Sequence, residues 1–127
     1  MKKNMAIIFV VIAVIVAGLW FWASSEQEKN APQTAVTSDI IFFYGQECPH
    51  CKDVEKFLAD NDVASKVKFD SLEVWHNTAN SNLLLQKAEE CGISKDKAGV
   101  PFLYAKGKCY VGTPDVENFF KQEAGIQ

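Results

Sequence analysis

The chain has 127 residues, of which 48% are apolar, with four cysteines and a formal net charge of −3. This length is enough for one domain of ordinary size and excludes two. Arginine is absent, and beyond position 22 there are 11 lysines against 16 acidic residues, a net charge of −5. The negative charge argues against nucleic acid, or an anionic lipid surface, as the main partner.

The first feature along the chain is an uncharged apolar run of 18 residues, Met5 to Trp22. As a helix it would span roughly 27 Å, close to the thickness of a bilayer core. Lys2 and Lys3 precede it, so the positive-inside rule predicts a cytoplasmic N-terminus. We expect residues 1–23 to be a transmembrane anchor, crossing with residues 5–22. The protein would be single-pass in a bacterial-type cytoplasmic membrane, with its domain on the periplasmic or extracytoplasmic side.

A cleavable signal peptide is the alternative interpretation of this segment. Ala23 and Ser25 are small residues that could precede a cut after Ser25. The apolar run is longer than the 7 to 15 residues of a signal core, which favours the anchor. Either way we expect an exported domain, spanning residues 39–127 and joined by a polar linker, residues 24–38.

The exported part begins with a strand and a helix. Residues 40–44, "IIFFY", form a continuous β-branched and aromatic run, which is typical of a strand buried on both faces. From Pro49 to about Asn61, apolar residues recur at helical spacing while charged residues take the other side. The sequence therefore predicts a central strand followed by an amphipathic helix.

A second strand and helix follow. Residues 67–74 alternate apolar and polar side chains, which predicts a strand parallel to the first, because a helix joins the two. Residues 80–91 place Leu84, Ala88 and Cys91 on one face of a second helix, with Gly92 just after its end.

The last elements are a hairpin and a helix. Residues 102–105 and 109–111 predict two short strands joined tightly around Gly107. Thr113 is the expected N-cap of a final helix, with Pro114 at its first position. The predicted order is β-α-β-α-β-β-α.

Two cysteines lie at the junction of the first strand and helix, in "GQECPHCKDV" from Gly45 to Val54. A strand, a C-x-x-C that opens a helix, and a Val-Pro about 50 residues later at a hairpin together resemble the thioredoxin superfamily, in a compact form of glutaredoxin size. The resemblance covers roughly residues 39–123. It implies a three-layer α/β fold with a four-stranded mixed sheet. The dipeptide between the cysteines, Pro49 and His50, is similar to that of bacterial periplasmic disulfide oxidases.

The motif suits thiol–disulfide exchange, which requires an attacking thiolate and a second thiol that resolves the mixed disulfide. Cys48 at the N-cap would have its sulfur near free amide groups and the positive end of the helix dipole. Pro49 at the first helical position fixes the turn. Cys51 lies one turn on and faces inward. We therefore expect Cys48 to attack and Cys51 to resolve, through a Cys48–Cys51 redox disulfide.

Two neighbours of Cys48 act in opposite directions. His50 between the cysteines could donate a hydrogen bond or positive charge to the thiolate and so favour the reduced form, which makes the disulfide a stronger oxidant. Glu47 would disfavour the thiolate if it is ionised and close. We expect His50 to tune the site towards oxidation.

The resemblance also implies a role for Val100 and Pro101. The proline before the third strand is normally cis in this superfamily, so a cis Val100–Pro101 bond is expected. Val100 would offer main-chain hydrogen bonds to an extended substrate, as in strand addition, and Pro101 would shield the sulfurs. The alternative is an ordinary trans proline at the start of a strand.

The other two cysteines have a structural interpretation. Cys91 and Cys109 are each either a small buried apolar residue or one half of a disulfide that closes a loop of about 18 residues. No second close cysteine pair of zinc-finger type accompanies Cys48 and Cys51, so no metal site is expected. His76, next to Trp75, is expected in a loop rather than in a site.

These observations predict a membrane-tethered extracytoplasmic thiol–disulfide oxidoreductase without a cofactor, which oxidises exported thiol proteins. An oxidase would need a recycling partner, for which a quinone-linked membrane oxidoreductase is the expected class. Two alternatives stay open at this point: an extracytoplasmic disulfide reductase, and a carrier that binds copper or zinc through the two thiolates.

Overall fold

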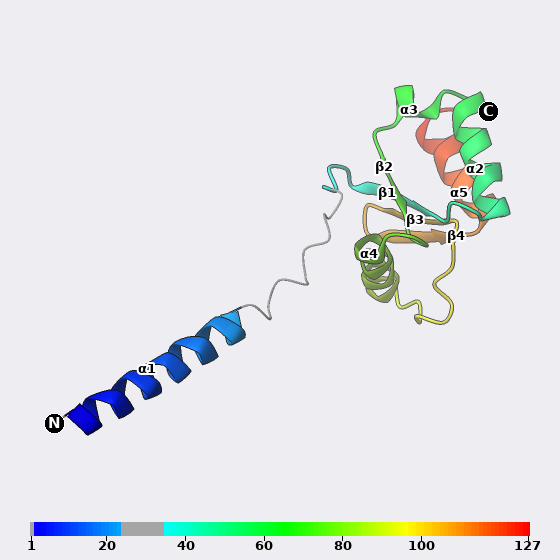
Figure 1. The fold of residues 1–127 in the computed structure, drawn as a ribbon. Helices are drawn as coiled ribbons and strands as arrows, with labels where there is room; N and C mark the ends of the chain where they lie inside the picture. The colour runs from blue at the N-terminus through cyan, green and yellow to red at the C-terminus, as the bar shows by residue number, and fades with distance from the viewer. Residues whose placement is uncertain (1, 24–34) are drawn as a thin grey trace. The chain divides into compact units, whose positions relative to one another are not determined.

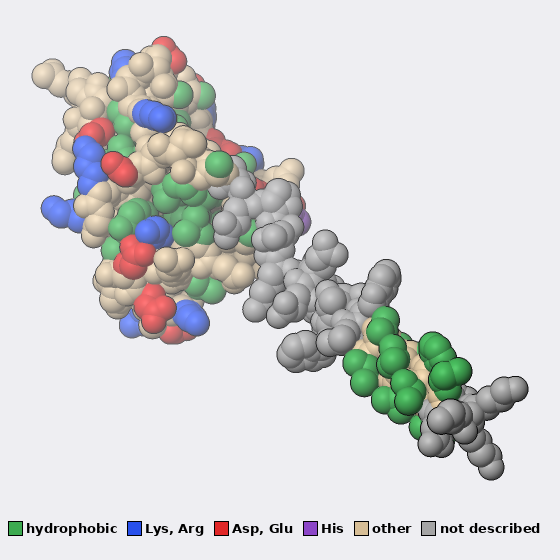
Figure 2. Space-filling model, turned by 90° about the vertical axis from the view of Figure 1, so that its left-hand side faces the viewer, with side chains coloured by type: hydrophobic (Ala, Val, Ile, Leu, Met, Phe, Trp, Pro, Cys, Tyr) green, Lys and Arg blue, Asp and Glu red, His purple; other side chains and the backbone are tan. Residues whose placement is uncertain are grey.

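The computed structural model of the chain describes residues 2–23 and 35–127. Its contacts divide the chain into two compact units, Met1–Ala31 and Pro32–Gln127. The first contains a single described helix, α1 (Lys2–Ala23). The described side chains of this helix are apolar and exposed (Figure 2).

The membrane assignment made from the sequence is wrong. Within the described residues, no helix is both long enough and apolar enough to cross a membrane. A single-pass protein anchored through residues 5–22, with its domain on the periplasmic side, is therefore contradicted. The prediction rested on the length and the lack of charge of the run from Met5 to Trp22. The alternative cleavage after Ser25 and most of the predicted linker, residues 24–34, lie outside the described residues.

The second unit is built on a four-stranded mixed sheet, as the resemblance implied (Figure 1). Its strands lie in the order β2-β1-β3-β4, and β1 pairs in parallel with β2 and antiparallel with β3, which pairs antiparallel with β4. Their bounds are β1 (Ile40–Tyr44), β2 (Asp70–Glu73), β3 (Phe102–Ala105) and β4 (Lys108–Val111).

Helices cover both faces of this sheet and complete three layers (Figure 1). Helices α2 (Pro49–Asp60) and α5 (Thr113–Glu123) lie side by side on one face, and α4 (Thr78–Glu90) lies on the other. A four-residue helix, α3 (Val63–Lys66), follows α2 and was not predicted.

Alternate residues of β1 divide the core between the two faces, because successive strand side chains point in opposite directions. Ile40 and Phe42 pack with α2 and α5, whereas Ile41 and Phe43 pack with α4. All four side chains are at most 5% exposed. The strand that ends at the cysteine motif is thus held from both sides, which fixes the position of the motif.

Several boundaries differ from the prediction. β2 is shorter than residues 67–74, because Val67 still caps α3 through a hydrogen bond to Val63. α4 begins earlier than expected, since the Asn77 side chain accepts the backbone N–H of Asn80. Thr37 and Ser38, placed in the linker, donate their backbone N–H groups to the Asp70 carboxylate at 2.6 and 2.8 Å.

The N-cap of α5 is Gly112, not Thr113. Gly112 has a φ of 91°, a conformation that a residue with a Cβ rarely adopts. Thr113 lies inside the helix, and its hydroxyl donates to the carbonyl of His50 at 3.2 Å. The threonine therefore joins α5 to the first turn of α2 rather than capping its own helix.

Candidate active site

Cys48 is the N-cap of α2, at the end of the turn that follows β1. Its backbone is extended, and its N–H donates to the carbonyl of Gly45 at 3.1 Å. Pro49 occupies the first turn of the helix, where a missing N–H has no cost. The Cys48 sulfur accepts the backbone N–H of Cys51 at 3.2 Å. The sulfur thus receives an amide donor at the positive end of the helix dipole.

Cys51 lies one turn further along α2 and is completely buried. Burial, a hydrogen bond with Cys48 and the charge of that neighbour together raise the pKa of the Cys51 thiol to about 12, and burial is the largest of these causes. Cys51 therefore remains a thiol at neutral pH. Both cysteines are free in this structure.

Val100 and Pro101 lie against this pair. Their peptide bond is cis, the geometry that the resemblance implied. The Cys48 thiol donates to the Val100 carbonyl across 3.9 Å. Pro101 is buried, and its carbonyl accepts the N–H of Gly112 at 2.9 Å. The structure thus brings together two separate stretches of the chain, the start of α2 with Cys48 and Cys51, and the Val100–Pro101 segment.

Within the part of the chain that the structure describes, the His50 side chain has one polar contact, with Asp53. Its imidazole is 78% exposed and lies 3.9 Å from the Asp53 carboxylate, also exposed. Among the contacts of the described residues, no hydrogen bond joins His50 to the Cys48 sulfur. The structure does not give this histidine the contact through which the sequence analysis expected it to act.

The sequence analysis missed an ion pair beside the motif. His76, expected only as a loop residue, lies with Nε2 at 2.8 and 3.0 Å from the two carboxylate oxygens of Glu47. No sequence signal links these residues, which are 29 positions apart and meet only because β1 and β2 are parallel neighbours.

Trp75 covers the turn before Cys48. A Cβ atom added to Gly45 would lie 2.4 Å from the Cδ2 and Cε2 atoms of the indole, so glycine is needed beneath the ring. The indole nevertheless remains 52% exposed. An exposed aromatic side chain thus borders the cysteine motif.

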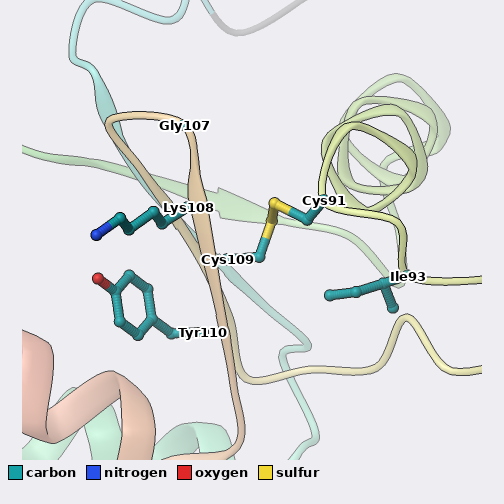
Figure 3. Close-up of a pocket in the computed structure, with 6 residues that line it drawn as sticks. All are labelled: Cys91, Ile93, Gly107, Lys108, Cys109 and Tyr110. Carbon is teal, nitrogen blue, oxygen red and sulfur yellow. A yellow bond between two sulfur atoms is a disulfide. The ribbon is translucent and has the colours of Figure 1, made fainter.

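Cys91 and Cys109 form a disulfide with a Cα separation of 6.1 Å. Figure 3 shows the bond joining the end of α4 to the edge strand β4, where both cysteines line a surface pocket. Of the two possibilities that the sequence left open for these cysteines, the disulfide is the one that the structure has. No group of three or more potential metal-ligating side chains occurs within the described residues.

Comparisons with known proteins support the fold. No protein-family profile matches the chain, and no curated protein sequence does. Among solved structures, a mutant of the thioredoxin-like protein BC3987 is 22% identical with a TM-score of 0.52, covering 72% of this chain and 100% of that one. A wheat glutaredoxin is 18% identical with a TM-score of 0.49, and the match covers 72% of this chain and 79% of that one. A buckwheat glutaredoxin–glutathione complex is 16% identical with a TM-score of 0.47, and the match covers 69% of this chain and 71% of that one. The domain therefore has a thioredoxin-like α/β fold with a four-stranded mixed sheet.

Proposed function

We propose that the domain is a thiol–disulfide oxidoreductase in which Cys48 exchanges disulfides with protein substrates and Cys51 resolves them. The observation that carries the proposal is the position of Cys48 at the N-cap of α2, with its sulfur 3.2 Å from the Cys51 amide and the second thiol buried behind it. An attacking sulfur, here 5% exposed, and a resolving thiol, here completely buried, are the two components that exchange needs.

In the oxidising direction, a substrate thiolate attacks the Cys48 sulfur of the Cys48–Cys51 disulfide, and the Cys51 sulfur leaves and takes up a proton. A second substrate thiolate then attacks the substrate sulfur of the mixed disulfide and releases Cys48 as a thiolate. The substrate loses two electrons and two protons and gains a disulfide, while the enzyme becomes the dithiol. An external oxidant must then restore the enzyme disulfide; a quinone-linked membrane oxidoreductase is the class proposed for this step.

In the reverse, reducing direction, Cys51 attacks the Cys48 sulfur of the mixed disulfide, re-forms the Cys48–Cys51 disulfide and releases the substrate thiol. Two of the contributions that raise the Cys51 pKa come from Cys48, its hydrogen bond and its charge. Both change when the Cys48 sulfur is held in a mixed disulfide, because that sulfur can no longer ionise. The Cys51 proton is then released more easily, so the resolving thiol becomes a nucleophile when it is needed.

We propose Val100 as the substrate contact. Its carbonyl lies 3.9 Å from the Cys48 sulfur, and it is half-buried at the edge of the site. Once Cys48 is in a mixed disulfide it has no proton to donate, which leaves this carbonyl free to accept an N–H from the substrate main chain. Pro101, buried beside it, shields the sulfurs from water.

The proposed direction is oxidation. The N-terminus of α2 stabilises the thiolate and hence the reduced enzyme, which raises the reduction potential of the disulfide. A reductase would use the same residues with a lower potential. The potential of the Cys48–Cys51 couple, measured in glutathione buffers, distinguishes the two: a value above about −200 mV supports the oxidase, and one near the −270 mV of a reducing thioredoxin contradicts it.

The test of the activity is disulfide formation in a peptide that carries two thiols. The oxidised protein should oxidise the peptide stoichiometrically, and Cys48→Ser should abolish the reaction. If Cys48→Ser retained full activity, the proposal would be wrong; tight binding of one zinc or copper ion per domain without exchange would favour the carrier instead.

A further inference from the structure

The loop between β2 and α4, residues 74–77, is tied to the turn that carries the cysteine motif. The carboxylate of Glu73 accepts backbone N–H groups from both segments: Trp75 and His76 at 2.8 Å each, and Gln46 at 3.3 Å. Burial opposes the ionisation of Glu73, but these three donors outweigh it and lower the Glu73 pKa. An ionised carboxylate thus fixes the loop beside the motif.

His76 is held by this loop against the residue that precedes Cys48. Its Nε2 lies 2.8 Å from Oε1 and 3.0 Å from Oε2 of Glu47. The hydrogen bond and the negative charge of Glu47 raise the His76 pKa, which keeps the imidazole protonated over a wider pH range. A protonated His76 thus neutralises the negative charge of the Glu47 carboxylate.

The pair matters for the sulfur because a lone carboxylate next to Cys48 would repel a thiolate. We propose that His76 is a positioning residue that acts through Glu47: by neutralising this carboxylate it preserves the thiolate of Cys48. The proposal rests on the proposed function. It assigns to His76 the tuning role that the sequence predicted for His50.

The remaining charged groups around the pair do not replace His76. Glu73, at the end of β2, is committed to three backbone donors. At the start of α2, His50 lies near Asp53, both exposed. The N-terminus of α4 presents Asn77, whose side chain accepts the Asn80 amide and carries no charge. Within these elements, His76 is the cation on Glu47.

The test is a double-mutant cycle on the reduced protein. His76→Gln keeps a hydrogen-bond donor at similar reach without the charge, and Glu47→Gln removes the carboxylate. The readout is the rate constant for alkylation of Cys48 by iodoacetamide at pH 6, which follows the thiolate population. We expect His76→Gln to slow alkylation about two- to threefold, the size of a short-range interaction between exposed charges, and to have no effect in the Glu47→Gln background.

The pH profile separates an electrostatic role from a structural one. In the native protein His76 is charged below its raised pKa and neutral above it. Its stabilisation of the Cys48 thiolate should therefore be largest at low pH. The ratio of native to His76→Gln rate constants should therefore fall towards 1 as the pH rises. A purely structural histidine would give a ratio independent of pH.

Lys106→Gln is the matched control, because it removes a lysine whose Nζ lies 2.6 Å from Glu123 in another exposed pair. Lys106 follows β3, whose last residue pairs with Ile40 at the end of β1 opposite the motif. A His76→Gln effect below 1.5-fold, or one of equal size in the Glu47→Gln background, overturns the proposal. Alkylation needs no substrate exchange, so this result is independent of whether Cys48→Ser abolishes activity.

Discussion

The first cysteine of each pair in this domain lies at the end of a helix, at the N-terminus of α2 in one pair and at the C-terminus of α4 in the other. Cys48 is the N-cap of α2, where free amide groups and the helix dipole favour a thiolate, and the pair is present as two thiols. Cys91 is the C-cap of α4, where the negative end of the dipole disfavours a thiolate, and the pair is bridged to β4. A thiolate is both the attacking and the leaving group in thiol–disulfide exchange. The first cysteine pair is therefore suited to exchange, and the second pair to a structural disulfide.

Removing Cys51, the completely buried member of the first pair, should have the largest effect. Cys51→Ser leaves Cys48 able to form a mixed disulfide but removes the thiol that resolves it. With a peptide disulfide as substrate, we expect the mixed disulfide on Cys48 to accumulate, detected by its mass, and turnover to fall roughly 100-fold or more. Rapid turnover without an adduct would show that Cys51 is not the resolving residue.

The reactivity of the two thiols should differ almost as much. Cys48 should react with iodoacetamide in the folded, reduced protein at pH 8, whereas Cys51, fully buried with a pKa of about 12, should not. Peptide mapping after timed alkylation gives the two rates, and we expect a ratio on the order of 100. Reaction at Cys51 should increase only as the pH approaches 12, because its thiolate is scarce below that pH. Equal labelling at pH 8 would remove the distinction between attacker and resolver.

Removing the second pair should cost stability and leave exchange intact. Cys91→Ala with Cys109→Ala opens a loop whose ends are 18 residues apart, which should lower the free energy of unfolding by about 3 kcal/mol. Urea unfolding measures this loss, and oxidation of the dithiol peptide at 25 °C checks the activity. If the double variant kept its stability but lost exchange, the roles of the two pairs would be reversed.

The smallest effect should come from the turn before Cys48. Gly45→Ala places a Cβ 2.4 Å from the Trp75 indole, which must move. We expect a loss of about 1 kcal/mol in unfolding free energy and a change in tryptophan fluorescence. Gly99→Ala is the control, because a Cβ there meets no atom within 4 Å. Equal stability of the two variants would mean that Trp75 does not pack on the turn.

The parts of the fold that depend on local pattern were predictable from the sequence. β1 has the predicted bounds, because five β-branched and aromatic residues in succession suit only a strand buried on both faces. The start of α2 was also predictable, since Pro49 at the first helical position marks it. The cap of α5 was not, because Gly112 starts the helix through its backbone and Thr113 is used in a tertiary contact with His50.

The candidate site also has features that the sequence predicted and features that it did not. The positions of Cys48 and Cys51 follow from one helix turn, which spacing determines. The contact between Glu47 and His76 depends on how two loops meet at the ends of β1 and β2, and no periodicity encodes it. The membrane assignment failed for another reason: it rested on the length and the lack of charge of one run of residues, and within the described residues no helix is long and apolar enough to cross a membrane.

The central claim is that Cys48–Cys51 is the redox couple and Cys91–Cys109 the brace. The most direct measurement equilibrates the folded protein in a series of glutathione buffers, quenches it with acid and alkylation, and maps the state of all four cysteines. We predict that Cys48 and Cys51 change together from dithiol to disulfide across the series, at a potential well above the roughly −300 mV below which structural disulfides lie, while Cys91 and Cys109 stay bridged throughout. A series in which Cys91 and Cys109 change state while Cys48 and Cys51 remain thiols would contradict the claim.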